Sequence, residues 1–324
     1  MRSVRITVST KYLPILLWVF VGAVAAAIPF GVLIGDPVLR QLLAPFSLHI
    51  ANEKAIYSPA AYFVLLTACY LLERKMPVNP RDFLSASFRY DLLWYFGNVC
   101  FNLAFLGYFA LWLNAFYQHY LSFLSIGGVG DWHPMARFAL GVLLTDFTRW
   151  LSHLIRHKVP AFWAFHAVHH SQTELNIFTD ARGHPVDSMV STVIRFLPMM
   201  MFGNPVPVIM AWLVFETVYP KFYHANVRIN LGPLRYLLVT PQSHRVHHGL
   251  DRIYRDKNFG FIFSVWDRLF GTQFADDTVY PATGIEGKAF PHESGTTPRS
   301  QLRSFARQLI YPFRSIAQPG VSSA

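Results

Sequence analysis

The chain has 324 residues, of which 53% are hydrophobic and 16% aromatic, and its mean hydropathy is +0.29. Such a composition is unusual for a soluble domain and is typical of a multispanning membrane protein. The formal net charge of +10 comes without a basic stripe interleaved with aromatic residues, so we favour contact with anionic lipid over nucleic-acid binding. The two cysteines exclude a disulfide framework and a cysteine zinc site.

Long uncharged runs predict helices that cross the membrane. The first is Tyr12–Gly35, a retained helix rather than a signal peptide, and the second is Ala55–Leu72. The third begins after Asp91, and its first ~22 residues suffice for a hydrocarbon core of ~30 Å. The fourth is about Met135–His157. Lys and Arg flank the first two runs but are absent from Tyr117–Pro134, which predicts a cytoplasmic N-terminus.

A further uncharged run, Phe196–Phe215, is interrupted by prolines and a glycine. A single crossing here would separate the histidines that follow it from those that precede it. We therefore predict a hairpin that dips into the membrane and returns, about Ser188–Met201 and Pro205–Tyr219. The predicted fold is an all-α membrane protein with four transmembrane helices, this hairpin and a cytoplasmic histidine-rich helical cap. Its regions are 1–134 with three spans, 135–275 with the histidines, and 276–324 as a tail that is amphipathic over Gln301–Phe313.

Ten of the fourteen histidines lie in less than a third of the chain. They are His153 and His157 in an H-x3-H, His166, His169 and His170 in an H-x2-H-H, His184 and His224 singly, and His244, His247 and His248 in a second H-x2-H-H. Residues three and four apart share a helix face, so each cluster can aim several imidazoles at one point. One pair alone would be typical of a solvated helix face, but three clusters beside apolar segments predict a metal site. The remaining four, His49, His119, His133 and His292, are predicted not to bind metal.

The sequence around these histidines carries further motifs. They are DFTRWLSHLIRHKVP (146–160), FWAFHAVHHS (162–171), RGHPVD (182–187), HANV (224–227), TPQSHRVHHG (240–249) and NFGFIFSVWDRLFGT (258–272). Over about residues 55–275 the chain resembles the fatty acid hydroxylase/sterol desaturase superfamily of integral-membrane di-iron oxygenases. The HP-x-D motif is closer to the sterol-desaturase-like and bacterial branches. The resemblance makes 135–275 the catalytic domain and implies two iron ions, O2 as co-substrate and the ten clustered histidines as ligands.

A centre of this kind hydroxylates or desaturates a C–H bond of a lipid, and we expect a sterol, an alkyl or acyl lipid, or a carotenoid, in that order. The chain has no dinucleotide-binding fingerprint, so a separate donor such as ferredoxin or cytochrome b5 with its reductase should supply electrons. An acidic donor would be drawn to a basic surface. The basic residues expected to form it are Arg156, Lys158, Arg245, Arg252 and Arg255.

Two carboxylates, Asp146 and Asp187, are candidates for holding a histidine N–H. Asp146 is costly in an apolar helix unless it is paired, and a structural pair with Arg149 explains it equally well. Two other functions stay open, a zinc-dependent membrane lipid hydrolase and a non-catalytic metal-binding membrane protein. The hydrolase needs a carboxylate as general base, and Glu174 and Asp187 are the nearest candidates because none of the histidine clusters contains one.

Overall fold

The computed structural model describes residues 59–82, 84–101, 105, 107–202, 218–287 and 289–317. Within these residues the named elements are all helices, and three isolated antiparallel bridges join loop segments. The longer helices are α3 (Pro59–Lys75), α4 (Ala86–Phe101), α5 (Gly107–Phe116), α6 (Pro134–Lys158), α7 (Pro160–His170), α8 (Pro185–Met201), α10 (Pro241–His247), α11 (Val265–Leu269) and α12 (Pro298–Ala317). Short π and 3-10 turns are η2 (Tyr117–Leu121), η3 (Ser122–Leu124), η4 (Val129–Asp131), η5 (Thr179–Ala181), η6 (Gly232–Tyr236) and η7 (Arg252–Tyr254).

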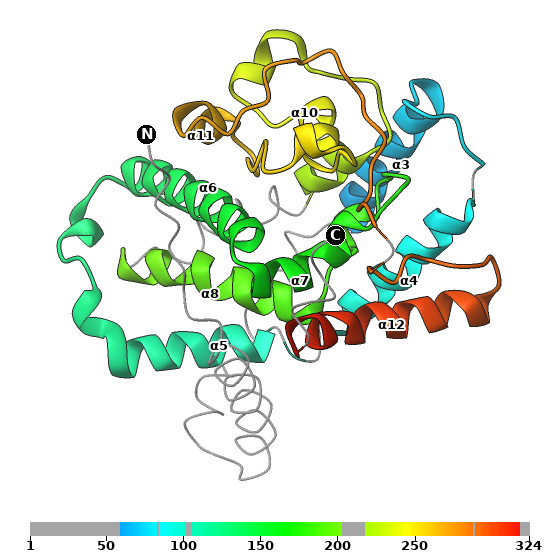
Figure 1. Ribbon diagram of the computed structural model, residues 1–324. Coiled ribbons are helices and arrows are strands. Elements are labelled where there is room, and N and C mark those ends of the chain that lie inside the picture. The colour runs from blue at the N-terminus through cyan, green and yellow to red at the C-terminus, as the bar shows by residue number, and fades with distance from the viewer. Residues whose placement is uncertain are drawn as a thin grey trace, which may run out of the picture.

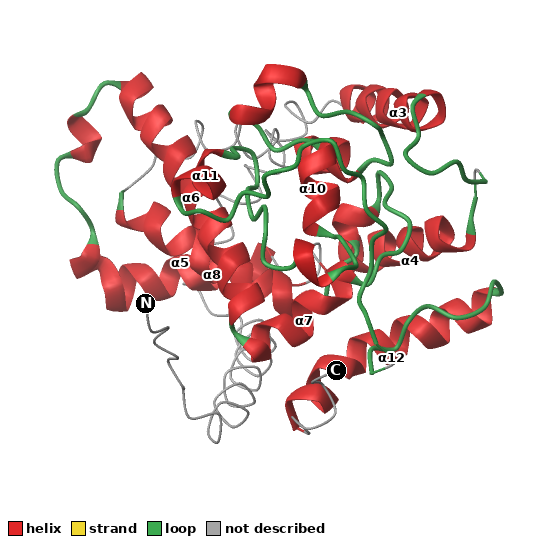
Figure 2. Cartoon of the chain, turned by 45° about the horizontal axis from the view of Figure 1, so that its top comes forward, coloured by secondary structure: helices red, strands yellow, loops and turns green. Residues whose placement is uncertain are grey.

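Helices α6, α7 and α8 form the centre of the molecule. α6 packs against both α7 and α8, and α5 contacts α8 on the side away from α6 (Figure 1). The C-terminal helix α12 lies along α7 and also contacts α4. Loops that carry α10 and α11 cover α6 and α7 from one side, as the two views show (Figure 2). The histidine-bearing segments therefore meet between the central helices and this cover.

Pro160 sets the sharp turn between α6 and α7. α6 ends at Lys158, and the next residue, Val159, is extended because Pro160 disfavours a helical backbone at the residue before it. Pro160 then occupies the first turn of α7, where its missing N–H is not needed. Because the two helices are joined by a single residue, the H-x3-H at the end of α6 lies beside the H-x2-H-H of α7.

α10 is short, and its start is fixed by a capping box. The Thr240 side chain accepts from the backbone N–H of Ser243, the Ser243 hydroxyl accepts from the backbone N–H of Thr240, and Pro241 occupies the first turn. A helix of seven residues has little stability of its own, so these caps matter for its orientation. They determine the direction in which the second H-x2-H-H points.

A hydrophobic core joins α4, α7 and α12. Tyr90 and Trp94 of α4 pack with Val168 of α7 and Phe290, and Phe305 of α12 packs against them. Trp94 and Phe305 have ring centroids 4.5 Å apart. The segment predicted to be amphipathic, 301–313, is thus part of a packed helix. A second cluster around Cys69 and Ile177 joins α3 to the loop after α7.

The prediction of four transmembrane helices is wrong. The second arm of the predicted hairpin, about Pro205–Tyr219, lies mostly outside the described residues. None of the helices in the described ranges is both long and apolar enough to cross a membrane. α3 and α8 have 17 residues each, while α6 has 25 but carries several charges, among them Asp146 and Arg149. Asp146 is fully buried and accepts hydrogen bonds inside the protein, so this charge belongs to the protein interior and interrupts the apolar run of α6. The predicted span Tyr12–Gly35 lies outside the described residues.

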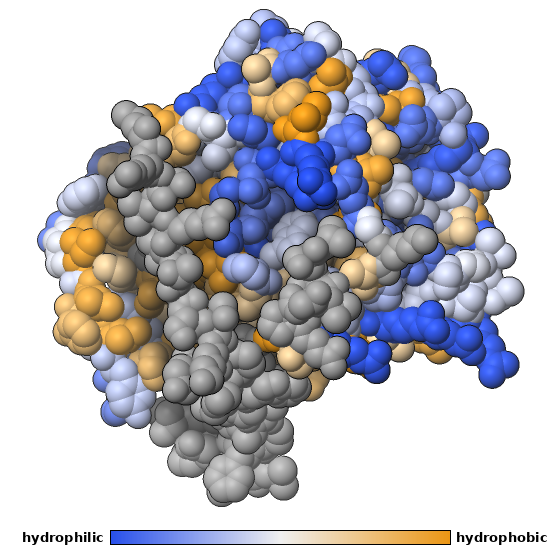
Figure 3. Space-filling model, in the orientation of Figure 1, coloured by the Kyte–Doolittle hydropathy of each residue, from blue (hydrophilic) through white to orange (hydrophobic). Residues whose placement is uncertain are grey.

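Some features of the predicted fold are not tested by the structure. The division into regions 1–134, 135–275 and 276–324 stays a prediction. The cytoplasmic placement of the histidine clusters was deduced from the predicted crossings, and it too stays a prediction. Figure 3 shows apolar side chains gathered along the edge formed by α5 and the segments leading to α6. Exposed large side chains in this stretch are Trp112, Phe116, Tyr120, Phe123 and Trp132.

Candidate metal centre

Nine histidines from separate helical segments converge on two neighbouring points. In each group, one ring nitrogen per residue lies within 4.8 Å of the others. The first histidine group consists of His153, His157, His166, His170 and His247. The second histidine group consists of His169, His224, His244 and His248. The rings of His170 and His248 stack with their centroids 4.4 Å apart, so the two groups are adjacent.

Each H-x2-H-H contributes to both groups. Its first and last histidines are four residues apart and share a helix face, whereas the middle one points in another direction. On α7 the outer pair belongs to the first group, and the middle residue, His169, belongs to the second. At α10 the assignment is reversed, because the outer pair belongs to the second group and His247 to the first. The repeated motif therefore ties the two groups together through both helices.

The nine imidazoles are held neutral. Burial lowers the pKa of each of them, to about 3 for His169 and for His224. The pKa of His153, His166, His170, His244, His247 and His248 is lowered well below the usual 6.5, and that of His157 is also lowered, in each case chiefly by burial. A neutral imidazole offers a lone pair, which is the form that binds a metal.

Several of their ring nitrogens are buried without a hydrogen-bond partner in the described part of the chain. They are Nε2 of His153, His166 and His247, and Nδ1 of His244 and His248. A buried polar atom without a partner is costly, and a metal ion would remove that cost. An all-imidazole donor set suits iron, zinc or copper. The two groups therefore fit a pair of such ions.

Backbone carbonyls orient four of these rings. Nδ1 of His153 lies 3.0 Å from the carbonyl oxygen of Phe259, and Nδ1 of His247 lies 2.7 Å from that of Lys257. In the second group, Nδ1 of His169 lies 2.9 Å from the Arg182 carbonyl, and Nδ1 of His224 lies 2.8 Å from that of Pro220. A carbonyl only accepts, so Nδ1 carries the proton and Nε2 keeps its lone pair for a metal.

The two predicted carboxylates have different positions. An oxygen of Asp187 lies 3.1 Å from Nδ1 of His166 and accepts a 2.8 Å hydrogen bond from Arg156. Asp146 instead accepts from the backbone N–H of Ile262 at 2.8 Å and from Nε1 of Trp266 at 2.8 Å. Asp187 thus lies where it can hold a histidine ring, while Asp146 holds the loop before α11.

His184, which was predicted to be a ligand, belongs to neither group. Its Nε2 donates to the carbonyl of Leu309 at 3.0 Å, and its Nδ1 accepts from the backbone N–H of Val186 at 3.1 Å. Burial lowers its pKa to about 4. Since both nitrogens are engaged, His184 ties the start of α8 to α12. Of the histidines predicted not to bind metal, His119 is exposed in η2, and His49 lies outside the described residues.

Two cavities reach the histidines from different directions. The larger, about 490 Å³, is bordered by His157, His170 and His247 of the first group and opens beside Arg252 and Arg255. The smaller, about 310 Å³, lies between α6 and α8. It touches both groups, through His153 and His166 of the first and His169, His224 and His244 of the second.

The sequence did not reveal the backbone carbonyls and buried carboxylates that surround the grouped histidines. The carbonyls of Lys257 and Phe259 have no side-chain signature, although both lie in or beside the quoted 258–272 motif. Asp267, within that motif, and Asp91, far upstream, were not singled out, yet both are almost completely buried. A buried acid that interrupts an apolar run is the signal that could have identified Asp91.

Comparison with known proteins agrees with this geometry. Residues 138–272, which include all nine grouped histidines, match the family model described as Fatty acid hydroxylase. This segment belongs to the fatty acid hydroxylase family. The resemblance expected from the histidine motifs is thereby confirmed. No solved structure matches the chain.

Curated relatives of the segment are lipid-modifying enzymes by name. Ornithine lipid hydroxylase OlsE of Rhizobium tropici is 32% identical over 187 residues, which are 56% of this chain and 52% of the relative. Alkylglycerol monooxygenase of Homo sapiens is 37% identical over 132 residues, 41% of this chain and 29% of the relative. Methylsterol monooxygenase 1 of Danio rerio is 26% identical over 184 residues, 53% of this chain and 61% of the relative. The chain thus spans less than two thirds of the length of each of these relatives.

Proposed function

We propose that the chain is an O2-dependent oxidoreductase that hydroxylates or desaturates a C–H bond of a lipid, with one iron ion held by each histidine group. The observation that supports this most strongly is the pair of adjacent groups formed by nine imidazoles. The names of the relatives, a hydroxylase and two monooxygenases, support the same reaction class. Iron as the metal is taken from the family resemblance, because the donor set alone would also suit zinc or copper.

Two histidine-held iron ions, when bound, supply the reduction of O2 with external electrons and the abstraction of hydrogen from an unactivated C–H bond. The residues of the chain supply the geometry for this chemistry. Carbonyls at Phe259, Lys257 and Arg182 keep the Nδ1 proton in place, so the Nε2 atoms face inward. Burial keeps the imidazoles neutral and keeps bulk water away from them.

We assign the lipid to the smaller cavity because it contacts both histidine groups. One of its walls is a polar row on α8, formed by Ser188, Ser191, Thr192 and Arg195. This polar wall favours a lipid whose oxidised carbon lies close to a polar headgroup. We therefore place polar alkyl or acyl lipids before sterols and carotenoids, which exchanges the first two places of the order expected from the sequence. The exposed aromatic edge near α5 provides a surface for contact with lipid, so the enzyme should act at a lipid surface.

The zinc hydrolase gains no support from the two carboxylates nearest to the histidines. Glu174 accepts a 2.7 Å hydrogen bond from Ser85, and Asp187 is paired with Arg156 at 2.8 Å. A general base must be free to take a proton from water at the metal. Glu174 is engaged with Ser85, and the Oδ2 oxygen of Asp187 is shared between Arg156 and His166, so the oxygenase is the function that we propose.

The proposed activity can be tested with purified chain loaded anaerobically with ferrous iron. The protein is given a lipid extract in vesicles, a reductase with ferredoxin or cytochrome b5, and air. We expect a lipid product that is heavier by one oxygen atom or lighter by two hydrogens, and ¹⁸O from ¹⁸O2 should appear in any hydroxylated product. Lipid cleavage that is equally fast without O2 and is supported by zinc would contradict the proposal and favour the hydrolase.

The electron donor is expected at the mouth of the larger cavity. Of the five basic residues predicted to form its docking surface, Lys158, Arg252 and Arg255 have side chains that are 53%, 78% and 49% exposed. Arg245 is buried, and Arg156 lies at the smaller cavity. The predicted surface is therefore reduced to three residues. Arg252 and Arg255 border the larger cavity, and none of the three borders the proposed lipid cavity.

Charge reversal tests this docking surface. The double variant Arg252→Glu/Arg255→Glu should lower turnover supported by an acidic donor by about tenfold at low salt, since steering of this kind changes association rates by 10-fold or more. The difference should shrink above roughly 0.15 M salt, where charges are screened over ~8 Å. Arg303→Glu/Arg307→Glu, on the exposed face of α12, is the matched control and should behave as the wild type. Equal turnover of both double variants at every salt concentration would rule out this docking surface.

A further inference from the structure

Besides Asp146, two carboxylates from distant parts of the chain are almost completely buried near the centre. Asp91 of α4 is 0% exposed, and Asp267 of α11 is 1% exposed. Burying a carboxylate is costly unless several donors satisfy it. Both are surrounded by donors, and in both cases several of these donors belong to a loop whose carbonyl oxygens face the grouped histidines.

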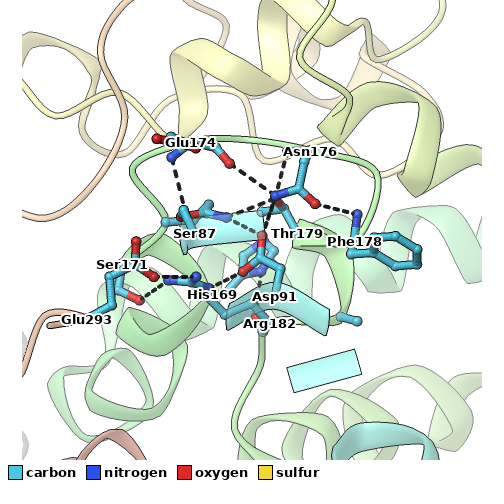
Figure 4. A network of polar contacts seen from close by, with 12 residues as sticks. Ser87, Asp91, His169, Ser171, Glu174, Asn176, Phe178, Thr179, Arg182 and Glu293 are labelled. Atoms are coloured by element: carbon cyan, nitrogen blue, oxygen red, sulfur yellow. Dashed lines mark hydrogen bonds and ion pairs between the residues drawn. The ribbon is translucent and has the colours of Figure 1, made fainter. Parts of the chain in front are cut away.

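Asp91 organises the loop between α7 and α8 (Figure 4). Its carboxylate accepts hydrogen bonds from Asn176 Nδ2 at 2.6 Å and from the Thr179 hydroxyl at 3.0 Å, and also from the side-chain amide of Gln172. It also accepts from Arg182 Nε at 2.6 Å. Four side chains of one loop are thus held by a single carboxylate on another helix.

Arg182 carries this constraint to the second histidine group. Its side chain is fully buried and is held between Asp91 and Glu293, whose Oε2 lies 2.9 Å from Arg182 Nη2. Its guanidinium also lies over the ring of Tyr90, 4.6 Å from the centroid. With the side chain fixed, the backbone carbonyl of Arg182 is fixed as well. That carbonyl is the acceptor 2.9 Å from Nδ1 of His169.

Asp267 has the corresponding role on the other side. It accepts from the backbone N–H groups of Phe259 at 2.8 Å and Gly260 at 2.7 Å, and from Trp150 Nε1 at 3.0 Å and the Thr272 hydroxyl at 2.6 Å. A Cβ added at Gly260 would lie 2.9 Å from an Asp267 oxygen and 2.8 Å from the Phe263 carbonyl oxygen, so the loop can approach this closely only with glycine there.

The loop held by Asp267 serves the first histidine group. Its carbonyls at Lys257 and Phe259 are the acceptors for Nδ1 of His247 and Nδ1 of His153. The backbone N–H of Phe259 donates a hydrogen bond to Asp267, while the carbonyl of the same residue faces His153. The constraint passes from the carboxylate through a single residue to the ligand.

We propose that Asp267 and Asp91 are positioning residues, each serving one metal. Asp267 sets the orientation of His153 and His247 in the first histidine group, and Asp91, through Arg182, sets that of His169 in the second. The proposal rests on the proposed function, in that each group holds one metal ion. It adds Asp91, which lies before the matched segment 138–272, to the residues on which the centre depends.

Metal binding by variants with one group disabled tests the proposal. His247→Ala leaves the second group intact, and His169→Ala leaves the first group intact. Cobalt(II) is titrated into each metal-free protein, and its visible d–d absorption reports affinity and coordination without any need for turnover. In the His247→Ala background, Asp91→Asn should weaken cobalt binding by about 10- to 100-fold, the range for loss of a group that orients a ligand, whereas Asp267→Asn should change it by less than about threefold. In the His169→Ala background the two effects should be exchanged.

Milder variants guard against failure to fold. Arg182→Lys keeps the charge beside Asp91, and Trp150→Phe removes one donor to Asp267 while keeping the ring. Each should weaken cobalt binding only at its own group, and unfolding of the metal-free protein, measured alongside, establishes that each variant is folded. Equal effects of both substitutions on both groups, or no effect at all, would overturn the positioning roles. Failure of the unsubstituted chain to bind two metal ions would instead refute the proposed function.

Discussion

Replacing His247 with alanine is expected to reduce the metal content from two ions to about one per chain and to lower turnover by at least about 100-fold. Loss of a residue that only orients a ligand already costs 10- to 100-fold, and loss of the ligand itself removes a metal–nitrogen bond. His169→Ala should have the same effect through the second histidine group. The two variants are informative together because each removes the middle histidine of one H-x2-H-H and disables a different group.

His119→Ala is the matched control, because His119 is exposed in η2 and belongs to neither group. It should retain two metal ions and full turnover. His184→Ala tests whether the tenth clustered histidine is a metal ligand or only a structural contact. Loss of the contact with Leu309 should lower stability while the metal content stays at two. Equal metal content and turnover in the His247, His169 and His119 variants would contradict the assignment of ligands.

The metal-free chain is expected to unfold in mild acid. Burial lowers the pKa of all nine grouped histidines in the folded state, while in the unfolded chain their pKa returns to about 6.5. Below that pH the unfolded state binds more protons than the folded state, so the free energy of unfolding falls as pH falls. Each histidine contributes up to about 1.4 kcal/mol per pH unit. Nine together amount to roughly 12 kcal/mol per unit, which is comparable to the whole stability of a typical domain.

Urea unfolding of the metal-free protein at pH 7.5, 6.5 and 5.5 measures this effect. The midpoint should already fall between the first two values, because half-protonation of nine unfolded-state histidines at pH 6.5 costs roughly 3 kcal/mol of stability, and it should collapse at the third. Bound metal should shift the loss of stability to lower pH, because metal binds only to the neutral histidines of the folded state. His119→Ala should follow the same curve as the wild type. A midpoint that is constant down to pH 5.5 would show that the histidines are not held neutral by burial.

The histidine clusters could be identified from the sequence because spacing alone places residues on a shared helix face. The sequence does not show which histidine belongs to which group. That assignment depends on the one-residue turn at Val159 and on the cap of α10. His184 has the residue type of a ligand and stands in a matching motif. Nothing in the spacing shows that the Leu309 carbonyl, from the other end of the chain, occupies its Nε2.

The sequence predicted the positions of many of the described helices, but it did not predict which residues contact their charged side chains. The run predicted as the fourth crossing, Met135–His157, nearly coincides with α6. An apolar helical period is the same whether the helix faces lipid or packs against other helices. The deciding feature is the set of partners around its charges, such as the backbone N–H of Ile262 at Asp146. Those partners lie far away in sequence, so the pattern of α6 alone could not reveal them.

Anomalous diffraction at the iron edge from crystals of the iron-loaded chain is the most direct test of the metal centre. We predict two iron positions per chain, one within the first histidine group and one within the second, bound by the nine grouped histidines and not by His184. A single iron position, or an iron bound through His184 in place of a grouped histidine, would contradict the two-group centre.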